Sequence, residues 1–249
     1  MKALLPFFIA LQFLTRIPLR VPEAPPRTVA RSLAYYPLVG LILGVLIAGL
    51  NSWLSDGPAP LRAALVLTLW VVLTGALHLD GFADSVDAWV AGRGEQARTL
   101  AVMKDPHSGP MAVVAVTILL LLKFAALENL SGTGGPTLAC IPLLARSAIP
   151  LLFATTPYVR PGGLGSTLAS GQSRALNIAV YSLAMLATIG VAGWSGLWLV
   201  LVLASVFFVL RHAMIGRLGG TTGDTAGALV EMSEAAMLVA LALYPAQQF

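Results

Sequence analysis

The chain carries little charge. Only 10% of its 249 residues are charged, whereas 57% are hydrophobic, and the mean hydropathy is +0.85. A soluble domain has about 25% charged residues, so this chain cannot cover a water-facing surface. The composition excludes a soluble enzyme, a disordered linker and a nucleic-acid-binding protein, despite a pI near 9.6. It indicates an integral membrane protein.

Cysteine and the common catalytic signatures are also scarce. The single cysteine, Cys140, excludes an internal disulfide, and its apolar neighbours predict a packed thiol. The sequence contains no Walker A loop, CxxC pair, HExxH or GxSxG. These absences argue against a P-loop ATPase, a redox protein, a zinc protease and a serine hydrolase.

Long uncharged runs predict an all-α bundle of about seven spans, because a crossing helix needs roughly 20 apolar residues. The predicted spans cover residues 33–54, 63–79, 111–128, 137–158 and 226–244, and the run 175–210 divides at residues 193–196 into two more. The first fifteen residues lack a signal-peptide cleavage site and are short for a span, which predicts an interfacial helix. Residues 1–249 are expected to form one integral membrane domain, since no linker separates a second one.

Basic residues orient this bundle. Most of the 15 lysines and arginines fall in the N-terminal segment and after the second, fourth and sixth spans, and the opposite side holds Arg62 alone. Cytoplasmic loops retain Lys and Arg, so the N-terminus is expected in the cytoplasm. We therefore expect an inner-membrane protein whose polar motifs face the cytoplasm.

The strongest chemical motif is HLDGFADSVD, residues 78–87, at the cytoplasmic end of the second span. Asp80, Asp84 and Asp87 are spaced i, i+4, i+7, so a helix continuing from the span places their carboxylates on one face. Such carboxylates repel one another, and Mg²⁺ binds one or two carboxylates together with substrate phosphates. The motif predicts a magnesium site; the alternative is a solvated acidic helix end.

A second motif, GGTTGDTAGA, covers residues 219–228 and leads into the last span. Its backbone N–H groups and hydroxyls at a helix N-terminus favour an anion, and Asp224 is a further candidate metal ligand. Thr222 is a candidate substrate-binding residue. Alternatively, Thr222 or Asp224 is a simple N-cap.

Ionisable residues also lie inside the predicted spans, where they face a partner or a polar cavity. The helical rise places Glu234 roughly 12 Å, and Arg146 roughly 16 Å, from the cytoplasmic ends of their spans. These similar depths predict an ion pair, which is either structural or part of a substrate site. Glu231 belongs to the same group of candidates.

Three further segments lie on the same side of the membrane. Lys104 and Asp105 precede the third span, Arg160 opens a glycine-rich loop that is expected to be flexible, and Arg16 ends the N-terminal segment. Lys104, Arg160 and Arg16 are candidate phosphate contacts. Asp105 is a candidate contact for a metal or for a helix N-terminus.

Together these motifs resemble the cobalamin synthase family, the adenosylcobinamide-GDP ribazoletransferases. The resemblance extends along most of the chain, through residues 13–18, 36–40, 78–84, 103–105 and 222–228, and through Glu231 and Glu234. The order of its DGxAD and TGDT elements is specific. It implies the last assembly step of the cobalamin nucleotide loop.

In that reaction, a ribose hydroxyl of α-ribazole or its 5′-phosphate attacks the cobinamide-linked phosphorus of adenosylcobinamide-GDP. GMP leaves, adenosylcobalamin or its 5′-phosphate forms, and Mg²⁺ is required. The resemblance implies metal ligands among Asp80, Asp84, Asp87 and Asp224, catalytic roles for Asp84, Asp87, Lys104 and Arg16, and substrate contacts from His78, Asp105, Arg146, Arg160, Thr222, Glu231 and Glu234. The implied partners are the two substrates and membrane lipid, with a homo-oligomer and association with other nucleotide loop enzymes as further options.

Rival functions fit the residues less well. A CDP-alcohol phosphotransferase has DGxxAR, whereas here one residue separates Gly81 from Ala83 and Asp84 follows. A membrane prenyltransferase usually has NDxxD, which is absent. A small transporter could use the charges inside the spans, but it needs access from both faces, and the polar motifs crowd one side without an inverted repeat.

Overall fold

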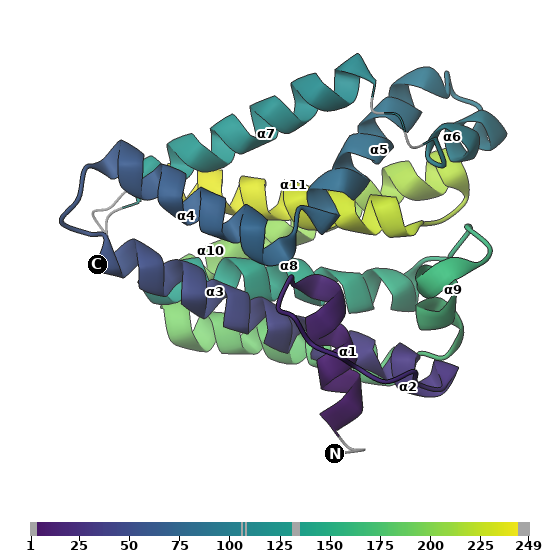
Figure 1. Cartoon of the computed structure of the whole chain (residues 1–249), viewed down its shortest axis with the longest axis horizontal. Helices are drawn as coiled ribbons and strands as arrows, with labels where there is room; N and C mark the ends of the chain where they lie inside the picture. Colours follow the sequence, from purple (N-terminus) through teal and green to yellow (C-terminus); the bar gives the residue numbers. More distant parts are fainter. Residues whose placement is uncertain (1–3, 106, 108, 131–134, 244–249) are drawn as a thin grey trace.

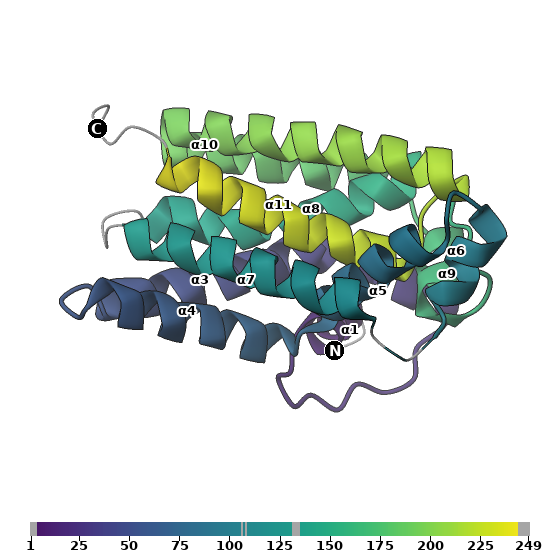
Figure 2. The ribbon, with the colours of Figure 1, turned by 90° about the horizontal axis from the view of Figure 1, so that it is seen from above.

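The structure, a computed structural model, describes residues 4–105, 107, 109–130 and 135–243. In these ranges every regular element is a helix, and β pairing is limited to one parallel bridge between Tyr158 and Thr221. Figures 1 and 2 show the long helices running side by side. The prediction of an all-α bundle is confirmed.

Within the described residues, six long helices form the bundle: α3 (Tyr36–Trp53), α4 (Ala59–Thr74), α7 (Pro110–Asn129), α8 (Gly135–Thr155), α10 (Arg174–Leu218) and α11 (Gly223–Ala242). In the described part of the chain, five helical segments are long and apolar enough to cross a membrane, or six if α4 and the bent helix after it count as one span. Most predicted boundaries agree to within a few residues. Tyr244, the predicted end of the last span, lies outside the described residues.

Helix α10 folds back on itself. Gly193 has φ 54° and ψ −128°, which interrupts the helix. A Cβ on Gly196 would lie 2.4 Å from the carbonyl oxygen of Thr188, so the two halves pack against each other directly after the break. Gln172, just before α10, and Arg211, near its end, both bond to the last turn of α8. The predicted division near Gly193 is confirmed, and the halves of α10 supply the fifth and sixth predicted spans.

Helix α8 forms much of the core. It packs against α3 and α10, and α11 packs on it and on α7. Most side chains of α8 are buried, including Cys140, so the predicted packed thiol is confirmed. Without a hydrophobic driving force between helices in lipid, such close packing holds a membrane bundle together.

The second predicted span ends early. α4 stops at Thr74, and Gly75 and Ala76 adopt left-handed conformations with φ of 59° and 57°. Helix α5 (Leu77–Ala91) then leaves at 87° and crosses the bundle, as Figure 1 shows. The expectation that the acidic motif continues the helix of the span is therefore wrong, because the left-handed pair turns the chain before Asp80.

Short helices gather at the end of the bundle where α5 lies, which we call the α5 end. They include α6 (Gln96–Val102) and α9 (Gly163–Ser170), visible together in Figures 1 and 2. The expectation of a flexible loop after Arg160 is wrong from Gly163 onward, because α9 packs on α2 (Pro26–Arg31) and buries Leu168. Before α2, the predicted short apolar helix is present as α1 (Leu5–Leu14), and a 3₁₀ helix, Ser32–Tyr35, leads into α3.

Candidate functional site

The acidic helix α5 packs directly on the first turns of α11. A Cβ on Gly81 would lie 2.9 Å from the carbonyl oxygen of Asp224, and one on Gly227 would lie 3.3 Å from the Cα of His78. Glycine permits this backbone approach because it has no Cβ. The contact joins the two sequence motifs into one site at the α5 end.

The carboxylates at this contact influence one another. Partial burial, followed by the negative charges of Asp80, Asp224 and Asp87, raises the pKa of Asp84 to about 6, although Arg160 opposes the shift. Asp84 itself is half-buried. A site of mutually repelling carboxylates is stabilised when a cation binds.

The donors suit Mg²⁺ in type. No three Asp, Glu, His or Cys side chains among the described residues form a complete metal-binding group. Mg²⁺ nevertheless needs only one or two carboxylates, with substrate phosphates and water as its other ligands. Asp80 and Asp84 have no hydrogen-bond or ion-pair partner in the described ranges, which leaves their oxygens available. Mg²⁺ stays a prediction.

Arg160 reaches the site through paired loops. Val159 N–H donates to the carbonyl oxygen of Thr221 at 3.0 Å, and Thr221 N–H donates to that of Pro157 at 2.8 Å. This pairing holds the loop after α8 beside the loop before α11. Arg160 Nη1 then lies 2.6 Å from Oδ2 of Asp224. A guanidinium with further N–H donors thus stands beside the carboxylates.

Thr222 caps α11. Its hydroxyl accepts the N–H of Thr225, and the hydroxyl of Thr225 accepts the N–H of Thr222, which completes a capping box. Thr222 is fully buried, and its hydroxyl lies 3.8 Å from the sulfur of Met103. These contacts favour the N-cap alternative, and substrate binding by Thr222 stays a prediction.

Asp87 is engaged with α7. One carboxylate oxygen accepts the N–H of Ala112 at 2.9 Å, and the other accepts the N–H of Gly109. Asp87 therefore satisfies free N–H groups at the positive end of that helix. Sequence reasoning missed this role, because nothing in the local pattern links Asp87 to residues in the next helix. Its part as base or metal ligand stays a prediction.

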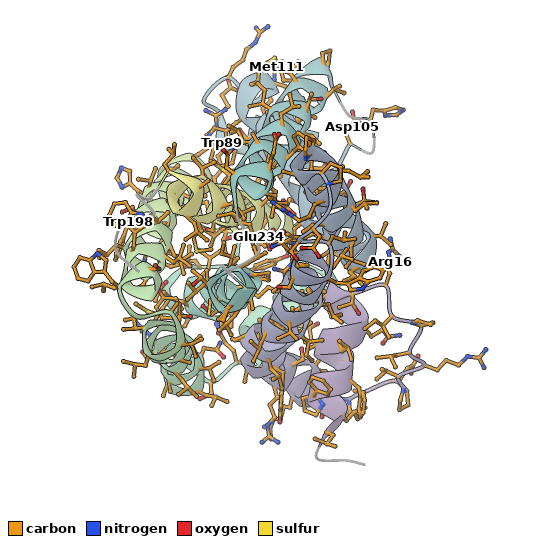
Figure 3. All side chains as sticks on the ribbon, turned by 90° about the vertical axis from the view of Figure 1, so that its left-hand side faces the viewer. Arg16, Trp89, Asp105, Met111, Trp198 and Glu234 are labelled. Carbon is orange, nitrogen blue, oxygen red and sulfur yellow. The ribbon has the colours of Figure 1, made fainter. Side chains whose placement is uncertain are left out.

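An ionic network lies deeper in the bundle. Glu234 pairs with Arg146, as predicted, and its other oxygen lies 2.7 Å from Nζ of Lys123. Lys123 also lies 2.5 Å from Glu231, and none of these four side chains is more than 5% exposed. Figure 3, a view along the bundle, places Glu234 near its centre.

This network balances two positive and two negative charges, which favours the structural alternative over a substrate site. Sequence reasoning missed the role of Lys123. Its signal was a lone cation in the middle of the third span, where an ionisable residue needs a partner.

Lys104 and Asp105 lie on the surface. Both side chains are exposed. The carboxylate of Asp105 pairs with the imidazole of His107 at 2.6 Å. Figure 3 shows Asp105 at the periphery, far from Glu234. Pro106 and Ser108 of the same segment lie outside the described residues. In the described residues, neither Lys104 nor Asp105 forms a hydrogen bond or an ion pair with a residue of the acidic motif or of the α11 start.

Arg16 lies at the bend between α4 and α5. Its backbone N–H donates to the carbonyl oxygen of Leu73 at 2.8 Å, and a Cβ on Gly75 would collide with the Arg16 side chain. Arg16 is therefore placed beside the start of the acidic helix but is exposed. Its contact with phosphate stays a prediction.

A cavity of about 170 Å³ opens beside the acidic cluster. It is enclosed by residues of α1, α3, α5, α8, α9 and α11, and the polar side chains in its wall include His78, Asp80 and Asp224. Both motifs thus reach one concave site, the usual setting for a bound small molecule.

Comparison with known proteins agrees with this site. A sequence model described as Cobalamin-5-phosphate synthase matches residues 6–242. The chain is 53% identical over 243 residues to the adenosylcobinamide-GDP ribazoletransferase of Pseudomonas fluorescens, covering 97% of this chain and 100% of that relative. It is 54% identical over 242 residues to the protein of that name from Pseudomonas putida, covering 96% and 99%. No solved structure matches the chain.

The family match includes α5, the capped start of α11 and the buried network, so the elements that build the site lie within the matched region. The relatives are similar over nearly their full length, which leaves no large part of the chain outside the comparison. The chain is therefore a membrane-embedded transferase of cobalamin biosynthesis, and it belongs to the cobalamin-5-phosphate synthase family.

Proposed function

We propose that this protein transfers adenosylcobinamide phosphate from adenosylcobinamide-GDP to α-ribazole or its 5′-phosphate. An oxygen–phosphorus bond forms to the ribose hydroxyl, the bond from that phosphorus to GMP breaks, and the hydroxyl proton passes to a base. The observation that carries the proposal is the contact of α5 with the first turn of α11, which joins Asp80 and Asp84 to the Asp224–Arg160 pair.

Mg²⁺ is the proposed cofactor, and Asp80, Asp84 and Asp224 are the residues that would hold it. When bound, it would neutralise the diphosphate and stabilise the departing GMP. Arg160 would orient a phosphate oxygen through N–H groups not used by Asp224. Asp84 is the preferred base, because both oxygens of Asp87 hold α7, whereas Asp84 has no hydrogen-bond or ion-pair partner in the described residues.

The site is proposed to face the cytoplasm from the inner membrane. Support comes from the arginines at the α5 end, which include Arg27, Arg31, Arg93 and Arg160, since basic residues mark the cytoplasmic side. Membrane lipid surrounds the apolar passes, and a homo-oligomer and contacts with other nucleotide loop enzymes stay predictions.

Turnover by detergent-purified protein tests the reaction. Adenosylcobinamide-GDP, α-ribazole and Mg²⁺ are supplied, and GMP and cobalamin are measured by mass spectrometry. We expect equal amounts of both products from wild type, and none after Asp84→Ala. Asp56→Ala, an exposed aspartate in the loop between α3 and α4, should keep full activity.

Folded, lipid-reconstituted wild type that forms no product would contradict the reaction. If Asp84→Ala remains active, the proposed reaction is kept, but Asp84 of α5 is not part of its catalytic site.

A further inference from the structure

We propose that the 170 Å³ cavity beside the acidic cluster holds the aromatic base of α-ribazole, with the ribose placed at Asp80 and Asp224. The inference rests on the proposed function and assigns a place to one group of one substrate. The walls that carry it, which we call the base cavity, comprise Phe13, Tyr36, His78, Phe153, Leu168 and Ala226.

The size of the base cavity selects a small flat group. Sites for drug-sized ligands measure about 300–1,000 Å³, so about 170 Å³ suits one fused ring system. A corrin ring or an entire nucleotide is too large. The corrin must therefore lie elsewhere, and a single base is the substrate part that fits.

The walls match an apolar aromatic ring. Phe13 and Tyr36 stack with centroids 6.3 Å apart and an interplanar angle of 28°, and Phe153 contributes a third ring. Leu168 and Ala226 fill the remaining wall, and both are at most 5% exposed. Aromatic side chains bind flat heterocycles through stacking, which here is combined with burial of apolar surface.

His78 supplies one polar group. The residue is 4% exposed, and in the described part of the chain neither ring nitrogen has a hydrogen-bond partner, while Nδ1 is sealed from the cavity and Nε2 is not. The benzimidazole base of α-ribazole keeps one ring nitrogen free of substitution, and this nitrogen accepts a hydrogen bond. A neutral imidazole with its proton on Nε2 provides a matching donor.

Guanine, the base of the other substrate, fits less well. Its edge carries several donors and acceptors, and a mainly apolar cavity would leave most of them unpaired, which is unfavourable.

The position of the base cavity also agrees with the chemistry. Asp80 is exposed and Asp224 partly exposed, whereas His78 and Tyr36 are buried, so the carboxylates stand at the outer end of the cavity. A nucleoside with its base inside would present its ribose to them. The attacking hydroxyl would then lie on the side where Arg160 and the α5 carboxylates meet the diphosphate.

Filling the base cavity tests the proposal. Ala226→Leu adds three carbons to its wall, and Ala228→Leu is the matched control, since Ala228 lies on the same helix but lines a separate apolar cavity with Phe82 and Trp89. We expect Ala226→Leu to raise the KM for α-ribazole about tenfold or more. The KM for adenosylcobinamide-GDP should stay unchanged, and Ala228→Leu should change neither value.

A ligand comparison tests His78 without depending on the folding of the Ala226 variant. α-Ribazole is compared with a riboside in which indole replaces benzimidazole and so lacks the acceptor nitrogen, by equilibrium binding to purified protein without the second substrate. Wild type should bind the indole compound about tenfold more weakly. His78→Leu should bind both compounds equally.

The outcomes separate the two proposals. Wild type that binds α-ribazole with this preference but releases no GMP retains the base cavity and overturns the proposed reaction. Turnover with an unchanged KM for α-ribazole in folded Ala226→Leu overturns the base cavity alone. A rise in the KM for adenosylcobinamide-GDP instead would assign the cavity to guanine, and equal binding of both ribosides by wild type would overturn the role of His78.

Discussion

Arg160 and Asp224 form an ion pair, with 2.6 Å between Nη1 and Oδ2, that ties the loop after α8 to the first turn of α11. Both side chains are partly exposed, at 32% and 19%, so the pair is open to a ligand. In this arrangement one cation stands beside carboxylates that repel one another. The relationship is that expected of a site that binds a phosphate together with a metal ion.

Arg160→Gln should weaken binding of the diphosphate substrate. The change removes a charged donor, whose hydrogen bond to phosphate is worth about 1.5–3 kcal/mol, so the KM for adenosylcobinamide-GDP should rise about tenfold or more. Steady-state kinetics measure this value, with Arg93→Gln, an exposed arginine of the same end, as the control. An unchanged KM would remove Arg160 from the phosphate site.

Gly81→Ala should disrupt the contact between α5 and α11, because the new methyl group would lie 2.9 Å from the carbonyl oxygen of Asp224. Overpacking of this kind destabilises the fold by about 1–3 kcal/mol. Turnover should fall as well, because the same contact positions the carboxylates. Gly49→Ala is the matched control, since a Cβ there meets no atom within 4 Å. Thermal unfolding and turnover are compared, and a fully active Gly81→Ala would show that the contact does not position the site.

Asp87→Asn separates capping from catalysis. The amide oxygen can still accept one N–H from the start of α7, so we expect a loss of stability of about 1 kcal/mol or less and retention of most activity. Asp84→Asn should instead abolish turnover, because an amide cannot accept the hydroxyl proton. If Asp87→Asn remains folded but lowers kcat about a hundredfold or more, Asp87 is the base.

Lys123→Met should destabilise the bundle, since it leaves Glu231 and Glu234 with one positive partner, Arg146, in a buried setting. Removing one member of a buried ion pair costs about 3–5 kcal/mol. Denaturation in detergent measures the loss, with Glu23→Gln, an exposed change, as the control. A stable but inactive Lys123→Met would favour a substrate role for the network.

Wild-type protein should bind a divalent metal ion, and this binding should depend on the carboxylates of α5. Mn²⁺, used as a paramagnetic substitute for Mg²⁺, should bind with at least about tenfold lower affinity after Asp80→Ala or Asp84→Ala, because one of few carboxylate ligands is lost. Asp56→Ala should leave Mn²⁺ binding unchanged. Electron paramagnetic resonance detects free Mn²⁺ directly, and equal affinity in all variants would place the metal elsewhere.

Much of the architecture could be predicted from local pattern. The passes follow from the length of apolar runs, and the break at Gly193 follows from a glycine-rich turn in a run too long for one crossing. The pair of Arg146 with Glu234 was predictable as well, since helical rise sets the depth of each charge in the membrane.

The predictions that were wrong or incomplete concern contacts between distant residues. The bend falls at Gly75, a residue type common at helix ends, but the run up to Leu79 holds no Asp, Glu, Lys or Arg, so hydropathy alone carried the predicted span past it. Lys123 completes its network through side chains of α11, and Asp87 caps a helix 22 residues away. Neither link has a local spacing by which it could be recognised.

The sequence by itself determined the membrane bundle, its side of positive charge and the two motifs, because hydropathy and charge act on each segment independently. Only the tertiary structure decided which residues meet. The right-angled turn of α5, and the approach of its backbone to α11 at Gly81, bring Asp84 to the Asp224–Arg160 pair and close the cavity beneath them. Such contacts depend on the packing of helices far apart along the chain, which no local pattern records.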